Sequence, residues 1–276
     1  MPYLVMQDGT QIYYEDRGHG EPIVFSHGLT ASHRKIQAFV DEFKDQYRCI
    51  VYDQRGHGSS DHKGINMNVK TLAQDLHELL EYLELDNVTL VGQSLGAATM
   101  FSYVEQYGCE RLKRLVNVDM TPCARNSDWK GGLARGEWTD EDFLADMDRF
   151  FENSAYGNWI VMRDIMMPAL KALPPEAEPG MVLTCKDSCE CDPFTSAGLW
   201  YSVYRTDSRP ALEKITVPFM HIFPETPICS MEAVDYMREH VKGEFVLADG
   251  IPGTSHMILM EAPKAVAEQV KAFMNS

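Results

Sequence analysis

Residues 87–98 read NVTLVGQSLGAA, and this stretch decides the fold. Its first half, residues 87–92, is a short apolar run typical of a buried strand, and the small residues 95–98 open a helix. Between them stands the pattern G-x-S-x-G, centred on Ser94. A strand that enters a helix through a very tight turn strains the backbone of the central residue, and the flanking glycines leave room for it. The hydroxyl of Ser94 is therefore expected to project above the edge of the sheet.

The position of Ser94 suits a nucleophile. The helix that begins after it aims free N–H groups and the positive end of its dipole at an oxyanion beside the serine. The alternative is a serine without a role in a glycine-rich turn, because the pentapeptide alone is common by chance. The strand before Ser94 and the helix after it favour the nucleophile.

Short apolar runs alternate with helical patterns along much of the chain, which is typical of a parallel sheet built from βα units. The expected strands, besides 87–92, are residues 22–26 (PIVFS), 47–52 (YRCIVY), 112–118 (LKRLVNV), 217–223 (VPFMHIF) and 244–248 (EFVLA). The clearest amphipathic helix carries five leucines on one face: Leu72, Leu76, Leu79, Leu80 and Leu83. A last helix begins at Pro263, and its expected inward stripe is Val266, Val270 and Phe273. The expected fold class is α/β, with a mostly parallel sheet flanked by helices.

From about residue 121 to residue 209 this rhythm breaks, and the pattern predicts helices and loops without a strand. We therefore expect one α/β core domain, residues 1–120 and 210–276, and a helical cap, residues 121–209, inserted over the functional site. The four tryptophans of the chain all fall in the cap segment: Trp129, Trp138, Trp159 and Trp200. These and other apolar residues of the cap either line a pocket or form the cap's own core: Phe143, Phe150, Phe151, Met162, Met166 and Met167.

The charge balance argues against several classes of partner. The chain carries 25 basic and 41 acidic residues, a net charge of −16. Nucleic acids and anionic membrane surfaces are bound by clustered Lys and Arg, so we expect neither as a partner. No apolar run approaches the ~20 residues that span a bilayer, and residues 1–8 lack the basic and apolar segments of a secretory signal. We expect a cytoplasmic protein, and the sequence leaves open whether it is a homo-oligomer.

Seven cysteines without an export signal predict reduced thiols. Three of them, Cys185, Cys189 and Cys191, are spaced C-x3-C-x-C. Zinc sites pair their cysteines as C-x2-4-C and need a fourth ligand, and no histidine lies between Cys191 and His221. We expect loop or buried thiols here rather than a metal site. No dinucleotide fingerprint, P-loop or H-E-x-x-H pattern appears either, so no cofactor is expected.

Further motifs accompany the Ser94 turn: His27-Gly28-Leu29, the pattern D-x-R-G-x-G-x-S at residues 53–60, and Ser255-His256 followed by Glu261-Ala262-Pro263. With these motifs the chain resembles the α/β-hydrolase family over essentially its whole length. The resemblance implies that Ser94 is the nucleophile and His256 the general base, later the general acid, because a serine needs an imidazole to take its proton. Among nine histidines, His256 alone sits late in the chain after a predicted last strand. The alternative for His256 is a solvated loop histidine.

The resemblance also implies an oxyanion hole made of two backbone amides, those of Leu29 and Leu95. These donors belong to the main chain, so the leucine side chains carry no part of the prediction. His27 and His57 occupy family motifs as well, and we expect them to support the loops around the oxyanion hole.

The acid of the expected triad is where the sequence departs from the family. Most relatives have G-x-x-D after the strand that corresponds to residues 217–223, whereas this chain has Pro224-Glu225-Thr226-Pro227. Glu225 lies on that loop, but two positions early and between prolines. Asp119 closes the strand 112–118, 25 residues after Ser94, a location that pancreatic-type lipases use for the acid. We favour Asp119 and keep Glu225 as the alternative.

These residues predict a serine hydrolase that cleaves a small to medium, largely apolar carboxylic ester or lactone through an acyl-enzyme. Serine at position 94 argues against haloalkane dehalogenase and epoxide hydrolase chemistry, because those relatives use aspartate there. Two alternatives stay open. One is another reaction in the same fold, such as that of a perhydrolase, an acyltransferase or a C–C hydrolase. The other is a ligand-binding protein with vestigial hydrolase activity. This alternative stays open because the chain lacks the aspartate of the family's G-x-x-D pattern.

Overall fold

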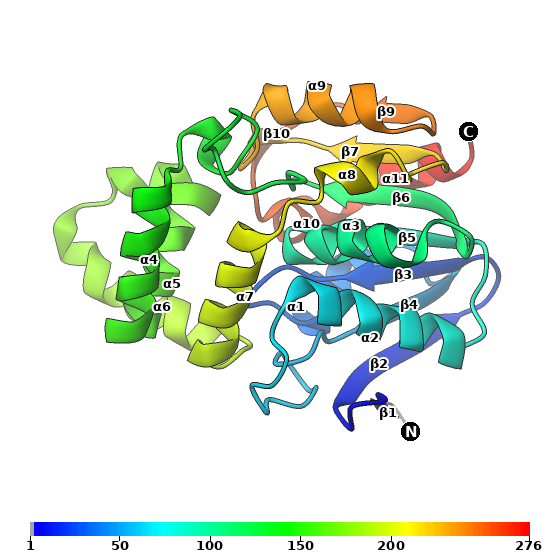
Figure 1. Cartoon of the computed structure of the whole chain (residues 1–276), viewed down its shortest axis with the longest axis horizontal. Helices are drawn as coiled ribbons and strands as arrows, with labels where there is room; N and C mark the ends of the chain where they lie inside the picture. The colour runs from blue at the N-terminus through cyan, green and yellow to red at the C-terminus, as the bar shows by residue number, and fades with distance from the viewer. Residues whose placement is uncertain (1–2) are drawn as a thin grey trace.

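The computed structural model describes residues 3–276, and its centre is an eight-stranded sheet (Figure 1). The strand order is β1-β2-β4-β3-β5-β6-β7-β9. Strands β3, β4, β5, β6, β7 and β9 run parallel to one another, and β1 and β2 add an antiparallel edge beside β4. The strands are β1 (Tyr3–Val5), β2 (Gln11–Gly18), β3 (Pro22–Ser26), β4 (Arg48–Tyr52), β5 (Val88–Gln93), β6 (Leu112–Val118), β7 (Phe219–Ile222) and β9 (Phe245–Leu247). The expected α/β class with a mostly parallel sheet is confirmed.

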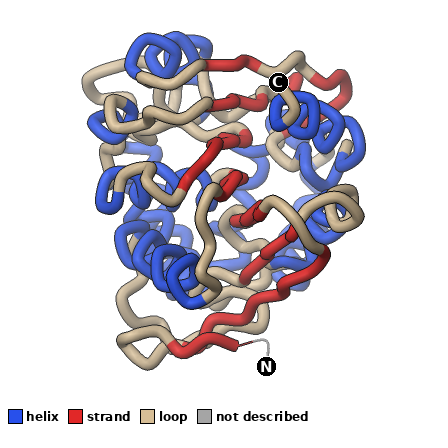
Figure 2. The backbone as a smooth tube through the Cα atoms, turned by 90° about the vertical axis from the view of Figure 1, so that its right-hand side faces the viewer, coloured by secondary structure: helices blue, strands red, loops and turns tan. Residues whose placement is uncertain are grey.

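Helices cover both faces of the sheet (Figure 2). One face packs against α1 (His33–Val40), α10 (Ile258–Glu261) and α11 (Pro263–Met274). The other face packs against α2 (Val69–Tyr82), α3 (Leu95–Tyr107), α8 (Arg209–Leu212) and α9 (Met231–His240). The predicted stripe of the last helix is confirmed, because Val266, Val270 and Phe273 are buried against the sheet.

Two parts of the sheet structure were not predicted. The antiparallel strands β1 and β2 are one part, and the other is a small parallel pair formed by β8 (Pro224–Thr226) and β10 (Ile251–Ser255). This pair joins the segment after β7 to the segment that leads into His256. It therefore bears directly on the geometry of the candidate site.

The chain between β6 and β7 consists of helices and loops, and these helices lie to the left of the sheet in Figure 1. They are α4 (Asp140–Glu152), α5 (Ser154–Val161), α6 (Glu178–Ser188) and α7 (Pro193–Arg205), with shorter helical turns η1 (Ala134–Gly136), η2 (Met162–Met166), η3 (Pro168–Ala172) and η4 (Pro175–Ala177). A capping box begins α4, in which the side chains of Thr139 and Asp142 each bond the backbone N–H of the other residue. None of the helices in residues 3–276 combines the length and apolar character needed to cross a membrane.

Candidate active site

Ser94 lies in the turn between β5 and α3, where its backbone adopts φ 53° and ψ −116°. This conformation is strained for a residue with a side chain. The neighbouring glycines make room for it. A Cβ atom on Gly96 would overlap the carbonyl oxygen of Ser26 in β3, and one on Gly92 would lie 2.6 Å from the backbone of Gly96. Residues 92–96 therefore form a tight strand-to-helix turn that only glycines at these two positions permit.

Two backbone amides near Ser94 have no acceptor among residues 3–276: those of Leu29 and Leu95. Leu29 is 8% exposed and Leu95 is 2% exposed, and buried N–H groups without a partner are rare in folded proteins. Leu95 is the first residue of α3, so its N–H also lies at the positive end of the helix dipole. The loop with Leu29 lies against the serine, since a Cβ on Gly28 would be 3.3 Å from the Cβ of Ser94. Both free donors are thus available to an oxygen bound beside Ser94.

His256 follows β10, and its Nδ1 lies 2.8 Å from Oδ2 of Asp119, the residue after β6. Both side chains are buried. A carboxylate at Nδ1 holds the ring proton there and leaves Nε2 as the acceptor. Gln93 donates from Nε2 to the carbonyl oxygen of His256 at 2.9 Å, which ties the histidine loop to the residue before Ser94.

Ser94 and His256 line the same cavity. Within residues 3–276 the Ser94 hydroxyl has no hydrogen-bond partner, so its contact with the imidazole is not formed in this state. Catalytic hydrogen bonds of this kind are often long without substrate and tighten when substrate binds. The arrangement therefore contains a carboxylate, an imidazole and an open hydroxyl in one place.

Asp119 is held by a buried chain of polar groups that sequence reasoning missed. The thiol of Cys229 donates to Oδ1 of Asp119 at 3.0 Å. Burial and the Asp119 carboxylate raise the pKa of Cys229 well above its usual value, so the thiol stays protonated. Behind it, Nε2 of His221 lies 3.9 Å from the Cys229 sulfur, and Asn117 donates from Nδ2 to Nδ1 of His221 at 3.0 Å. Burial lowers the pKa of His221 to about 4, so this ring is neutral.

Glu225, the alternative acid, lies elsewhere. Its side chain is exposed and accepts a hydrogen bond from the backbone N–H of Gly253 across the β8–β10 pair. The segment after β7 instead offers donors to Asp119, because the N–H of Ile228 lies 3.1 Å from its Oδ2. The structure thus brings Asp119, and not Glu225, to His256.

His27 and His57 are buried within the loops that follow β3 and β4. Burial lowers the pKa of both rings, that of His57 to about 3, so both are neutral. His27 accepts at Nε2 from the N–H of Gln54, and His57 accepts at Nε2 from the N–H of Thr30. These bonds join the two loops and fix the segment that carries Leu29.

The cavity at Ser94 is small, about 20 Å³, which is room for roughly one water molecule. Four methionines line it: Met162, Met166, Met257 and Met260. It adjoins a second cavity of about 20 Å³ under α5 and α6, because Leu29, Thr30, Met162 and Met166 line both. None of the tryptophans contributes to either lining among the described residues, and Trp138, Trp159 and Trp200 are buried in the helical segment. These three tryptophans therefore belong to the buried interior of the helical segment.

No group of three or more His, Cys, Asp and Glu side chains in residues 3–276 could hold a metal ion. Cys185 lies in α6, and Cys189 and Cys191 lie in the loop after it. Met257 and Met260, which flank the site beside His256, carried no signal in the sequence, because a methionine after a histidine is common by chance. Cys229 carried none either, since its role depends on contacts with residues more than a hundred positions away.

The comparison with protein families gives a match to the alpha/beta hydrolase fold over residues 21–158, half of the chain. The chain is 38% identical to the non-heme chloroperoxidase CPO-A1 of Kitasatospora aureofaciens over 126 residues, 44% of this chain and 45% of that relative. The chain thus spans less than half the length of this relative and of two other curated haloperoxidase relatives.

Two further similarities extend along the whole chain. The 3-oxoadipate enol-lactonase 1 of Acinetobacter baylyi is 23% identical over 262 residues, 92% of this chain and 88% of that relative. The structure of an esterase from Exiguobacterium antarcticum superposes with a TM-score of 0.80 at 21% identity, and the match covers 99% of both chains. At this identity the superposition establishes the fold alone.

Proposed function

The chain belongs to the alpha/beta hydrolase family, and from this premise we propose that it is a serine hydrolase. Its substrate is a small to medium, largely apolar carboxylic ester or lactone, which it cleaves through an acyl-enzyme. The observation that carries the proposal is the 2.8 Å contact between Asp119 and His256, because His256 lines the same cavity as Ser94 in its strained turn. A carboxylate bonded to an imidazole, and a serine hydroxyl in the same cavity as that imidazole, are the parts that nucleophilic acyl transfer needs.

In the first half of the proposed reaction, Ser94 Oγ attacks the carbonyl carbon of the ester while Nε2 of His256 takes the hydroxyl proton. The carbonyl oxygen becomes an oxyanion, and the free N–H groups of Leu29 and Leu95 stabilise it. The imidazolium then gives its proton to the departing alkoxide. Asp119 stabilises the imidazolium without taking the proton itself.

In the second half, water attacks the carbonyl carbon of the acyl-enzyme, and His256 takes its proton. The intermediate collapses, the proton returns to Ser94 Oγ, and the carboxylic acid leaves. Besides the ester and water, the two steps as proposed use only groups of this chain. The free thiols of all seven cysteines suit the cytoplasmic location that we propose.

We propose that residues 121–209 act as the cap of the site. Met162 and Met166 from this segment line the cavity at Ser94, and Phe150, Asn158 and Cys185 line the cavity next to it. Methionine side chains are flexible and can move to admit a substrate. Because the cavity holds only about one water molecule before these side chains move, we expect short acyl groups to fit best.

The proposal is tested by ester turnover and by covalent labelling together. The purified protein should hydrolyse p-nitrophenyl acetate, and a fluorophosphonate should label Ser94 and block that turnover. Turnover that survives complete labelling of Ser94, or labelling at another serine, would contradict the proposal. A protein that neither turns over the ester nor takes the label would be a ligand-binding member of the family.

The acyl group should be short. We expect kcat/KM to fall by roughly tenfold or more from the acetyl to the octanoyl ester, since added methylenes do not fit the methionine-lined cavity. Met166→Ala should widen this cavity, and the difference in kcat/KM between the acetyl and octanoyl esters should become smaller. Met181→Ala, in the same segment but outside the cavity lining, serves as the control. Equal activity of the unchanged protein on both esters would show that the cavity does not set acyl length.

The thiol of Cys229 should tune the pH dependence of the reaction. Cys229→Ala removes a donor from the Asp119 carboxylate and leaves more of its charge to stabilise the imidazolium of His256. We therefore expect the acidic limb of the kcat/KM profile to move to higher pH by roughly one unit. Cys229→Ser keeps a donor and should keep the profile. Cys123→Ala, at another buried cysteine, is the control and should leave the pH profile unchanged. If Cys229→Ala also leaves the profile unchanged, the Cys229 thiol does not influence the pH dependence.

The chloroperoxidase relatives favour one second candidate, the perhydrolase reaction. Hydrogen peroxide would replace water and attack the same acyl-enzyme, which yields a peroxy acid and frees Ser94. A cavity that admits one water molecule can admit a molecule of similar size. Peroxy acid formation from an ester and hydrogen peroxide, measured beside hydrolysis of the same ester, distinguishes the two.

A further inference from the structure

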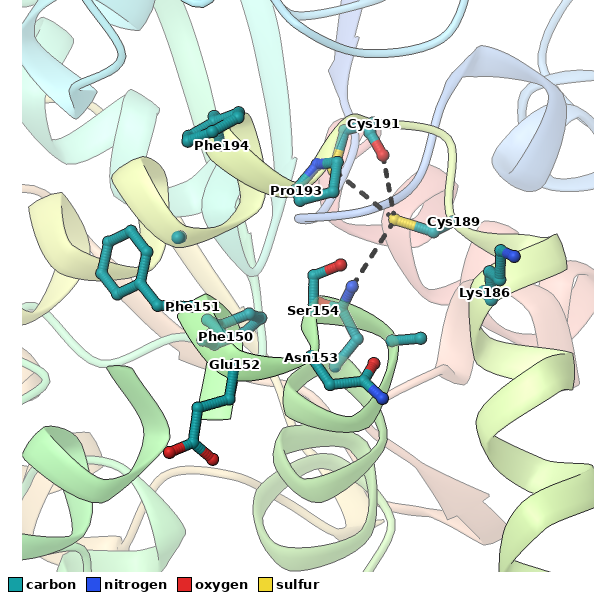
Figure 3. A pocket seen from close by; sticks show the side chains of 13 residues that line it. Phe150, Phe151, Glu152, Asn153, Ser154, Lys186, Cys189, Cys191, Pro193 and Phe194 are labelled. Atoms are coloured by element: carbon teal, nitrogen blue, oxygen red, sulfur yellow. Dashed lines mark hydrogen bonds between the residues drawn. The ribbon is translucent and has the colours of Figure 1, made fainter. Parts of the chain in front are cut away.

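A much larger cavity than the one at Ser94 lies on the helical segment. It has a volume of about 610 Å³, and Figure 3 shows it from close by. Three phenylalanines, Phe150, Phe151 and Phe194, form part of its wall, and two cysteines, Cys189 and Cys191, lie at another side of it. The proposed reaction uses neither thiol.

The two sulfur atoms are 3.6 Å apart and hydrogen-bonded to one another (Figure 3). The residue between them is tied at both ends: the N–H of Glu190 donates to the carbonyl oxygen of Thr30 at 2.9 Å, and its carbonyl oxygen accepts from the N–H of Gly58 at 2.7 Å. These bonds fix the backbone of the loop, so the two thiols are held together at the cavity rather than meeting by chance.

The surroundings of Cys189 lower its pKa on balance, and in the protonated form its thiol donates to the carbonyl oxygen of Cys191 at 3.3 Å. The hydrogen bond with Cys191 lowers the pKa of Cys189 to about 7, and the same bond, together with burial, raises the pKa of Cys191. Asn158 also donates to the Cys189 sulfur, at 3.8 Å. Burial raises the pKa of the other five cysteines: Cys49, Cys109, Cys123, Cys185 and Cys229. A thiolate beside a protonated thiol is the arrangement of an attacking and a resolving cysteine.

We propose that Cys189 and Cys191 are a redox-active pair that small disulfides, such as glutathione disulfide, convert reversibly to an intramolecular disulfide. The Cys189 thiolate attacks one sulfur of the small disulfide, which forms a mixed disulfide and releases one thiolate. Cys191 then loses its proton and attacks the Cys189 sulfur, which forms the Cys189–Cys191 bond and releases the second thiol. Two protein thiols are oxidised and one small disulfide is reduced to two thiols. Excess of the small thiol reverses both steps.

One tryptic peptide reports on the pair. Cleavage after Lys186 and Arg205 releases residues 187–205, which contain Cys189 and Cys191 and no other cysteine. The whole native protein is treated with glutathione disulfide, its remaining thiols are alkylated, and the peptides are weighed. We expect peptide 187–205 to be lighter by two hydrogen atoms and free of alkyl groups, and dithiothreitol to restore both alkylation sites. Two alkylated thiols in this peptide after oxidation would overturn the proposal.

Single substitutions separate the two roles. Cys191→Ser should stop the reaction at a stable glutathione adduct on Cys189, and Cys189→Ser should remove both products from peptide 187–205. In brief alkylation at neutral pH, Cys189 should react roughly tenfold faster than the partly exposed Cys109, because more of it is thiolate. Cys109→Ser is the control and should leave the disulfide unaffected. Faster reaction at Cys109, or an adduct on Cys191 in the Cys189→Ser protein, would contradict the assignment.

Discussion

Ser94→Ala is expected to lower kcat for p-nitrophenyl acetate by about 10⁶-fold while the melting temperature stays that of the unchanged protein. The hydroxyl is the only atom that the substitution removes, and it has no hydrogen-bond partner among the described residues, so the fold loses no contact with it. The strained backbone at φ 53° is the same for alanine and serine, since both carry a Cβ. The effect on turnover is large because the three groups of a triad act as a unit.

The control for this substitution is Ser102→Ala, two turns further along α3. That serine is also buried, and we give it no part in the reaction. Its variant should turn over the ester like the unchanged protein. Ester turnover that survives Ser94→Ala would place the nucleophile elsewhere and end the serine-hydrolase proposal.

The parts of the fold that were predictable carry their signal in a few neighbouring residues. The Ser94 turn is one, because its serine and both glycines lie within five consecutive residues, and Gly92 is needed by the backbone of Gly96 in the same turn. The buried strands of the parallel sheet are others, since both of their faces are covered and they appear as continuous apolar runs. The strand β2 (Gln11–Gly18) was missed for the opposite reason. It pairs near the edge of the sheet and carries charged residues such as Glu15, Asp16 and Arg17, which break the apolar pattern.

The pair β8–β10 was missed because its residues argue against a strand. Pro224 begins β8, and Pro252 and Gly253 lie inside β10. The hydrogen bonds between these two strands hold the segment that leads into His256. The position of the histidine therefore could not be predicted from the residues near it in the sequence. Tertiary contacts determine it.

In the helical segment, residues 121–209, the sequence did not predict which apolar side chains face the cavity. Its composition predicted apolar residues near a pocket, but the sequence does not say which of them face inward. In the structure Trp138 packs against Trp200 and Phe143 within the segment, while Met162 and Met166 reach the cavity at Ser94. Both groups are equally apolar, so only the packing of α4, α5 and α7 separates them.

Asp119→Asn is expected to keep the fold and lower kcat by about 10⁴-fold. An amide at this position can donate its N–H₂ to Nδ1 of His256, which moves the ring proton to Nε2 and removes the acceptor that Ser94 needs. The measurement is single-turnover acylation by p-nitrophenyl acetate, which reports the serine attack itself. Melting temperatures check that the buried amide is tolerated, since Asp119 also accepts from Ile228 and Cys229.

Glu225→Gln is the matched control, because Glu225 is the carboxylate on the loop where most relatives keep the acid. Its Oε2 accepts from the backbone N–H of Gly253, and an amide oxygen can accept the same bond, so we expect nearly unchanged turnover. A mild effect of Asp119→Asn with a severe effect of Glu225→Gln would require the loop after β7 to rearrange when substrate binds. Mild effects of both would mean that His256 works without a carboxylate partner, and the 2.8 Å contact with Asp119 would then only position the ring. Since Asp119 lies at the end of β6 and the segment with Ile228 and Cys229 bonds to its carboxylate, we expect Asp119 to be the acid.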